Sequence, residues 1–272
     1  MMKDITLGQY YPGQSPIHRL DARMKLLLVI ALIVCVFLAQ TPAAYALCAA
    51  LVFFAVALSG VPIGRILRGL RPLWFVLLLT AVLNLLYTGG TPLISFWKIT
   101  VTTEGLYRTG AMLLRVVLLV LGTSLLTYTT SPVSLTDGLD RLLSPLGKIG
   151  LPVHEFSLMM TIALRFIPTL VEEVDKISSA QKARGSDLET GRLSQRVRAL
   201  IPILVPLFLS SFRRADELAV AMECRCYRGG KGKTRLHEQR LAGRDWISAA
   251  VLAAGIAGVV LCNVFVRWGA LA

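Results

Sequence analysis

Residues 26–64 read LLLVIALIVCVFLAQTPAAYALCAALVFFAVALSGVPIG, a run of 39 residues that contains no charged side chain. A helix that spans a membrane needs about 20 apolar residues, so this run is long enough for two spans. The polar triplet at 40–42 (QTP) interrupts it near the middle, where a proline after two polar residues favours a turn. The run therefore predicts a hairpin of two membrane helices, roughly 25–39 and 43–60.

Three further apolar runs predict three more spans, at about 72–89, 106–128 and 246–266. The chain of 272 residues is 55% hydrophobic and 17% charged, against about 45–50% and about 25% in an average soluble domain. The expected fold class is therefore an all-α polytopic integral membrane protein with about five transmembrane helices. Residues 1–24 are too polar for the apolar part of a signal peptide, so we expect them to remain as a cytoplasmic segment.

The distribution of basic residues predicts the topology. Of the 29 Lys and Arg residues, 18 lie in 129–245, four in the first 25 residues and three in 61–71. Loops rich in Lys and Arg stay in the cytoplasm, which places the N-terminus inside and the C-terminus outside. The predicted organisation is a cytoplasmic segment at 1–24, four spans within 25–128, a cytoplasmic domain of amphipathic helices at 129–245, and a fifth span with the C-terminus at 246–272.

Arg115 is the single charged residue in the apolar runs 26–64, 72–97, 109–136 and 246–266. It is either a buried cation on a conduction path or an arginine near the outer surface that extends to the interface, and we favour the second interpretation. The spans contain no series of acids or histidines of the kind that forms a proton relay. This pattern argues against a secondary transporter or a pump.

The cytoplasmic block at 129–245 has helical periodicity. Pro132, after the N-cap sequence Thr130-Ser131, begins a predicted amphipathic helix that ends near Gly150. A long amphipathic helix is predicted from Glu155 to about Arg184, and an uncharged helix at 199–212 continues as a charged one at 213–223. Such helices could lie on anionic lipid, but 13 acidic residues beside 18 basic ones favour a surface that faces proteins.

Both long helices end at an arginine with small neighbours. Arg184 lies between Ala183 and Gly185, and Arg225 lies between Cys224 and Cys226, with Gly229-Gly230 as the expected stop of the second helix. One such arginine is explained by the helix dipole alone. Two on successive helices favour a two-pronged contact in which each planar guanidinium enters a groove of a two-fold partner.

These motifs give the chain a family resemblance. Residues 12–21 (PGQSPIHRLD), residues 164–168 (LRFIP) and the paired arginine motifs resemble the transmembrane T component of energy-coupling factor (ECF) transporters over nearly the whole chain. The first motif, Ala183-Arg184-Gly185, is intact. The second departs, because Cys224 and Cys226 stand where the family has Ala and then Gly or Ser.

The resemblance implies a scaffold and coupling subunit without catalytic activity of its own. Its implied partners are two ABC ATPase subunits, which bind ATP and Mg, a substrate-binding membrane S component, and membrane lipid, with no nucleic acid. Arg184 and Arg225 would each dock in one ATPase, so that ATP-driven closure moves the helices that carry them. The likeness of the N-terminal stretch to T components that serve several S components favours vitamin uptake over a dedicated cobalt or nickel importer, which stays open as an alternative.

Other classes of function are less well supported. Cys224, Cys226 and His237 offer three soft ligands, fewer than the four of a structural zinc site, so we expect no metal and no resident cofactor. A membrane-embedded lipid-modifying enzyme would need clustered Asp or His near the spans. Asp137 and Asp140 are the nearest pair, and we interpret them as solvent-facing residues of one helix.

Overall fold

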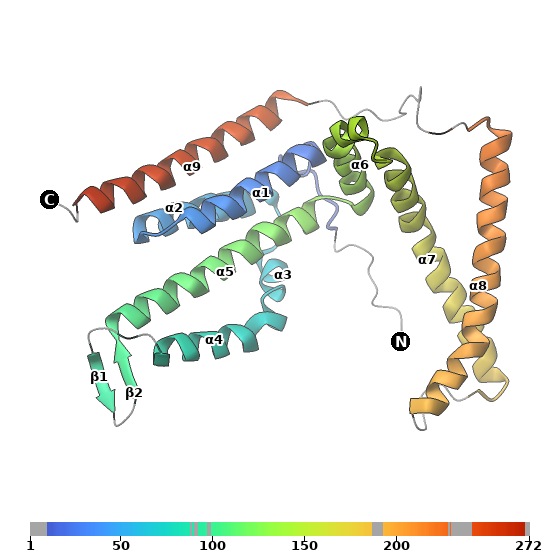
Figure 1. The fold of residues 1–272 in the computed structure, drawn as a ribbon, viewed down its shortest axis with the longest axis horizontal. Helices are drawn as coiled ribbons and strands as arrows, with labels where there is room; N and C mark the ends of the chain where they lie inside the picture. The colour runs from blue at the N-terminus through green and yellow to red at the C-terminus, as the bar shows by residue number, and fades with distance from the viewer. Residues whose placement is uncertain are drawn as a thin grey trace. The chain divides into compact units, whose positions relative to one another are not determined.

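The computed structural model describes residues 10–87, 89, 92–96, 99–186, 193–227, 229 and 241–269. The chain folds as two compact units (Figure 1). We call the unit formed by Gly8–Gly138 and Gln239–Ala272 the membrane unit, and the unit formed by Leu139–Glu238 the α7–α8 unit.

The helices of the membrane unit begin where the sequence supplies caps. Asp21 accepts a hydrogen bond from the Arg23 amide at the start of α1, and Thr41 caps α2, which has proline at its first position. Gly60, at a φ of 67°, ends α2 in the left-handed region. The helices are α1 (Ala22–Leu38), α2 (Pro42–Ser59), α3 (Ile63–Arg68), η1 (Arg71–Leu73), α4 (Trp74–Tyr87), α5 (Thr103–Thr129) and α9 (Gly243–Gly269), and α6 (Pro132–Leu143) follows α5 into the second unit.

Four stretches of the described chain are long and apolar enough to cross a membrane: Pro42–Ser59, Ile63–Leu86, Thr103–Thr129 and Gly243–Phe265. Helix α1 has 17 residues, which is at the lower end of the range of about 17–25 for a span. The all-α polytopic membrane class is therefore confirmed. The third apolar stretch begins earlier than predicted, because the short helices α3 and η1 precede α4.

A short β-hairpin connects α4 to α5, where the sequence predicts only a loop. Strand β1 (Pro92–Phe96) pairs antiparallel with β2 (Ile99–Thr102), and Phe96 lies opposite Ile99. The β-branched run ITVT at 99–102 is typical of a strand. The hairpin lies at one end of α4 and α5 (Figure 1) and is too short to change the helical fold class.

Glycines let the membrane helices approach closely. A Cβ atom added to Gly255 of α9 would lie 2.4 Å from Leu51 Cδ1 of α2, and one added to Gly122 of α5 would lie 2.5 Å from Leu32 Cδ2 of α1. Small residues at helix contacts are characteristic of membrane proteins. The buried core beside these contacts includes Cys35, Val36, Ala44, Cys48, Val52, Leu118 and Val259.

The α7–α8 unit is dominated by two long helices, α7 (Val153–Ala183) and α8 (Leu193–Cys224), which follow the short helix η2 (Ser144–Ile149). Gln181 Nε2 donates to the Pro202 carbonyl over 3.5 Å, and Arg214 donates to Glu173 over 2.7 Å. The contact later in α8 (Arg214) is made to the residue earlier in α7 (Glu173), so the two helices are antiparallel, as Figure 1 also shows. The two predicted long helices are confirmed, and α8 is continuous through Pro202 and Pro206.

Candidate coupling site at two helix ends

The C-terminal end of α7 forms a Schellman motif around Arg184. The Ser186 amide donates to the Gln181 carbonyl over 3.0 Å, and the Gly185 amide donates to the Lys182 carbonyl over 3.0 Å. Gly185 has a φ of 85°, in the left-handed region that closes this motif. Arg184 is therefore the last residue before the chain reverses, and its side chain is exposed.

The C-terminal end of α8 has the same backbone geometry around Arg225. The Tyr227 amide donates to the Met222 carbonyl over 3.0 Å, and the Cys226 amide donates to the Glu223 carbonyl over 2.8 Å. Cys226 has a φ of 58° and takes the role that Gly185 has in α7. The prediction that Gly229 stops this helix is wrong, because Cys226 already reverses the chain three residues earlier.

The two helix ends match, and we call each of them a tip: the first tip is Ala183-Arg184-Gly185 and the second is Cys224-Arg225-Cys226. Arg225 and its neighbours Cys224 and Cys226 are exposed, as are Arg184 and Ala183 at the first tip. At each tip a guanidinium follows the last turn of a helix, where the unpaired carbonyls carry a partial negative charge. Cys224 and Cys226 are thus compatible with the same backbone motif that Ala183 and Gly185 form at the end of α7.

The two tips lie at opposite ends of the helix pair. Gln181, one turn before Arg184, contacts Pro202 in the first third of α8. From Pro202 to the C-terminal end of α8 the helix extends about 30 Å, at about 1.5 Å per residue. Arg184 and Arg225 are therefore separated by roughly that length of helix.

Glu173 fixes α7 against α8 between the tips. Its carboxylate accepts hydrogen bonds from the Ser210 hydroxyl and from Arg214. The Ser210 hydrogen bond and the neighbouring Arg214 charge hold the pKa of Glu173 below its usual value. The charged form is thus favoured, and the ion pair with Arg214 stabilises the relative position of the two helices.

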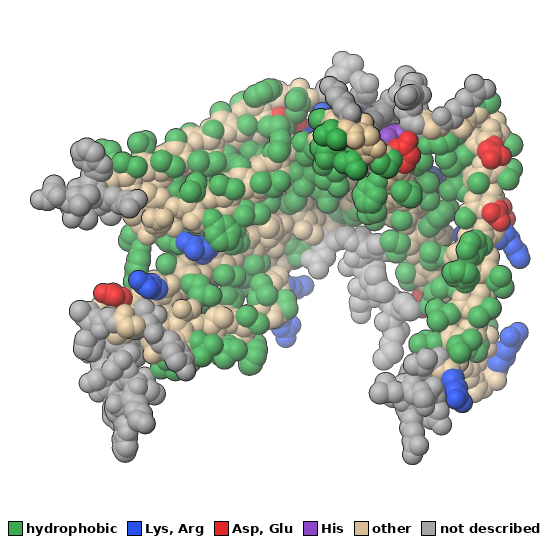
Figure 2. Space-filling view, viewed as in Figure 1, with side chains coloured by type: hydrophobic (Ala, Val, Ile, Leu, Met, Phe, Trp, Pro, Cys, Tyr) green, Lys and Arg blue, Asp and Glu red, His purple; other side chains and the backbone are tan. Residues whose placement is uncertain are grey.

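Charge is distributed differently over the two units. Figure 2 shows mainly hydrophobic side chains over α1, α2 and α9, whereas acidic and basic side chains are spaced along α8. Large exposed apolar residues also line the middle of α8, at 200–212. They are Leu200, Ile201, Leu204, Val205, Phe208, Leu209 and Phe212.

The two carboxylates considered for an enzyme site, Asp137 and Asp140, differ in exposure. Asp137 is exposed as predicted, but the interpretation of Asp140 as solvent-facing is wrong, because its side chain is only 7% exposed. Asp140 Oδ1 lies 3.8 Å from His154 Nδ1, at the start of α7. The pair connects α6 to α7 and explains the burial of this carboxylate.

No metal cluster is found in the part of the chain that the structure describes. No group of three or more His, Cys, Asp or Glu residues is placed there to hold an ion. His237, the third ligand considered beside Cys224 and Cys226, lies outside the described residues.

Arg115 makes contacts inside the protein. Its guanidinium donates to the Ala39 carbonyl over 3.2 Å and to the Tyr45 hydroxyl, and lies 5.6 Å from the centre of the Phe37 ring. The contacts place it beside the α1–α2 turn, the end of the unit that we predicted to be external. Its head group binds the carbonyl of the residue that ends α1, a role that neither sequence interpretation includes.

A buried polar network at the other end of the membrane unit was missed by the sequence analysis. Lys25 Nζ donates to the carbonyls of His18, over 3.1 Å, and Thr129, over 2.8 Å. Asp245 Oδ1 accepts from the Asp21 amide over 2.9 Å. This network joins the starts of α1 and α9 to the end of α5, and the positions of Asp21 and Asp245 immediately before or within the first turn of an apolar helix were its only signal.

The comparisons with known proteins identify the family of the chain. A family model described as "Cobalt transport protein" (CbiQ) matches residues 13–236. A protein of Acidaminococcus fermentans is 51% identical over 269 residues, which is 99% of each chain, and one of Clostridium kluyveri is 53% identical over 251 residues, 92% of this chain and 93% of that one. Both relatives are named energy-coupling factor transporter transmembrane protein EcfT. The chain thus belongs to the family of energy-coupling factor transporter transmembrane proteins, within the broader CbiQ family.

Proposed function

We propose that this chain couples two ATPase subunits to a substrate-binding membrane protein, with Arg184 and Arg225 each docked in one ATPase. The observation that carries the proposal is the pair of identical Schellman motifs, each of which presents an exposed arginine. A planar guanidinium donates hydrogen bonds to carboxylates or carbonyls in a fixed geometry. Two arginines that are presented in the same way suit a partner that has two equivalent binding grooves.

The separation of the tips supports a two-fold partner. Tips about 30 Å apart, at about 1.5 Å of rise per residue along α8, can reach two separate subunits. The Glu173 contacts with Ser210 and Arg214 hold α7 to α8, so a displacement of one tip is passed to the other helix. Closure of the two ATPases would therefore move the pair as a unit.

The distribution of charges and the helix ends that meet in one network support an orientation with the N-terminus in the cytoplasm. The start of α1, the end of α5 and the start of α9 meet in the Lys25 network. We assign this end, the N-terminus and the α7–α8 unit to the cytoplasm, because 129–245 holds 18 of the 29 basic residues. ATP and Mg would then be bound by the partner subunits, and this chain would have no catalytic role.

We infer that the transported substrate is a vitamin bound by a separate S component. The relatives at about 50% identity are named for energy-coupling factor transport, which supports a role in such a transporter. The choice of a vitamin rests on the resemblance of the N-terminal stretch to T components that serve several S components. A dedicated cobalt importer is the second candidate, because the matching family model is described as a cobalt transport protein. Uptake of labelled vitamins and of labelled Co²⁺ by cells that express the chain with its partners distinguishes the two.

Copurification tests the coupling site. The double variant Arg184→Ala, Arg225→Ala should lose the ATPase subunits from the purified complex, since each buried and hydrogen-bonded charge contact is worth about 2–5 kcal/mol on truncation. Each single variant should retain them in part. Arg213→Ala is the matched control, because Arg213 is an exposed arginine of α8 away from the tip. Normal recovery of both ATPases with the double variant would refute the docking role.

A further inference from the structure

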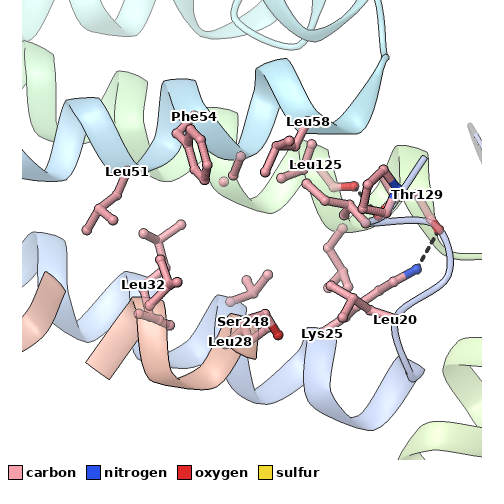
Figure 3. Close-up of a pocket in the computed structure, with 18 of the residues that line it drawn as sticks. Leu20, Lys25, Leu28, Leu32, Leu51, Phe54, Leu58, Leu125, Thr129 and Ser248 are labelled. Carbon is pink, nitrogen blue, oxygen red and sulfur yellow. Dashed lines mark hydrogen bonds between the residues drawn. The ribbon is translucent and has the colours of Figure 1, made fainter. Parts of the chain in front are cut away.

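A pocket of about 430 Å³ lies inside the membrane unit (Figure 3). Its walls come from α1, α2, α5 and α9 and include Leu28, Leu32, Leu51, Phe54 and Leu125. The volume falls within the range of about 300–1,000 Å³ that is usual for sites of small molecules. Nearly all of its lining is apolar, so its occupant must be largely hydrocarbon.

The pocket has one polar end. Lys25 and Arg244 are the charged residues that line it. The Lys25 ammonium is engaged by the carbonyls of His18 and Thr129, whereas Arg244 is exposed at the first turn of α9. Arg244 therefore offers a cation to an anionic group that sits at the end of a hydrocarbon chain.

The depth of the pocket matches part of one leaflet. Its α1 wall runs from Lys25 to Leu32, a rise of about 10 Å at about 1.5 Å per residue. The hydrocarbon core of one leaflet is about 15 Å deep, half of a core of about 30 Å. A chain that starts at the polar end would therefore fill the pocket from the interface inward.

The pocket is also open toward the side of the unit. Phe54 and Leu58 on α2 and Ile247 on α9 are 57%, 40% and 66% exposed. Further along the same helices, Gly255 packs closely against Leu51, so the two helices meet there. Exposed apolar side chains on membrane helices face lipid, so hydrocarbon can enter between α2 and α9.

We propose that the pocket holds an acyl chain of an anionic phospholipid, whose phosphate pairs with Arg244. The topology that we assign puts this end at the cytoplasmic leaflet, where anionic lipids attract basic residues. The lateral opening supplies the chain directly from the bilayer. The site does not involve Arg184 or Arg225, so its test is independent of the coupling role.

Lipid retention in nanodiscs tests the proposal. The chain is reconstituted with phosphatidylglycerol and phosphatidylcholine in a one-to-three mixture, exchanged into detergent, and analysed for bound lipid by native mass spectrometry. Phosphatidylglycerol that carries a diazirine in its acyl chain is photolysed in a parallel sample. The parent should retain phosphatidylglycerol selectively, and the cross-links should map to α1, α2 and α9.

Two variants separate the head group from the chain. Arg244→Gln should lower the preference for phosphatidylglycerol by about fivefold, as expected for loss of about 1 kcal/mol of attraction to an anionic head group. Arg68→Gln, which removes an exposed arginine outside the pocket, should have a smaller effect. Ala55→Trp should fill the pocket and remove the bound lipid, whereas Ala57→Trp, exposed on the same helix and outside the pocket, should retain it. Ser248→Leu serves as the filling variant if Ala55→Trp does not fold.

Three results would overturn the proposal. Equal lipid retention by the parent and a folded pocket-filling variant would place the lipid elsewhere. Equal retention of phosphatidylglycerol and phosphatidylcholine by the parent would remove the role of Arg244. Cross-links that fall outside the pocket would assign the retained lipid to another site.

Discussion

Cys226 occupies the left-handed region at a position where glycine is the usual residue. A side chain in this region costs about 1–2 kcal/mol relative to the right-handed helix. The second tip therefore keeps its geometry at some expense in local stability, while Gly185 closes the first tip without that cost.

Cys226→Gly should slow hydrogen exchange at the end of α8. The change removes strain of about 1 kcal/mol, so the amides of Cys226 and Tyr227, which close the motif, should exchange about fivefold more slowly. Gly185→Ala is the opposite change at the first tip and should accelerate exchange of Gly185 and Ser186. Faster exchange in Cys226→Gly would show that the thiol itself stabilises the turn.

Glu173 makes the α7–α8 contact sensitive to acid. Its pKa is lowered in the folded state, so its contribution to stability is present above the unfolded value of about 4.3 and is lost as the pH falls through the lower folded pKa. Hydrogen exchange in α7 and α8, corrected for intrinsic rates, should therefore increase below about pH 4. Glu173→Gln should exchange faster at neutral pH and lose this acid dependence, and a parent-like acid response in that variant would assign the effect to another group.

At the scale of elements, most helices could be predicted from local signals. The polar interruption at 40–42 immediately precedes α2, and the cap sequence before Pro132 immediately precedes α6. The apolar period that predicts α7 lies within that helix itself. The β-hairpin was missed because its strands are too short to give a clear period. The Lys25 network was missed because it joins residues more than 100 positions apart, and no local pattern reports such a contact.

Gly255 tests how closely α2 and α9 pack. Gly255→Val places new atoms in the space of Leu51 and should lower the stability of the membrane unit by about 1–3 kcal/mol through overpacking. Thermal unfolding of the detergent-solubilised chain measures the loss, and Leu51→Ala in the same chain should restore part of it. Gly110→Val on α5 is the control, because nothing lies within 4 Å of an added Cβ there. Equal losses at both glycines would attribute the effect to helix propensity.

At the scale of the whole molecule, the helical membrane class and the family could be predicted from the sequence. Long uncharged runs leave few alternatives to membrane helices, and residues 12–21 and the two arginine motifs carry the family resemblance. The matching geometry of the tips could not be predicted, since Cys226 is not a residue that normally adopts the left-handed region. The burial of Asp140 could not be predicted either, because its partner His154 is on α7, which is separated from α6 in the sequence by η2.

The topology gives a prediction for the entire chain. An odd number of spans with a cytoplasmic N-terminus places the C-terminus outside. A small accessibility tag after Ala272 should react with an impermeant reagent in intact cells, and a tag within 230–240 should react only after permeabilisation. Labelling of the C-terminal tag only in permeabilised cells would contradict the five-span arrangement.

ATP-driven uptake, measured in proteoliposomes with the complete complex, tests the central claim most directly. Arg184→Ala and Arg225→Ala should each lower uptake by at least about tenfold, because a lost charge contact of about 2 kcal/mol exceeds a factor of ten, while the S component still binds its ligand. Arg184→Lys should also impair uptake, since lysine keeps the charge and loses the planar fork, and Arg213→Ala should behave as the parent. Uptake equal to the parent's in the double alanine variant, with the complex intact, would contradict the coupling role of the two arginine tips.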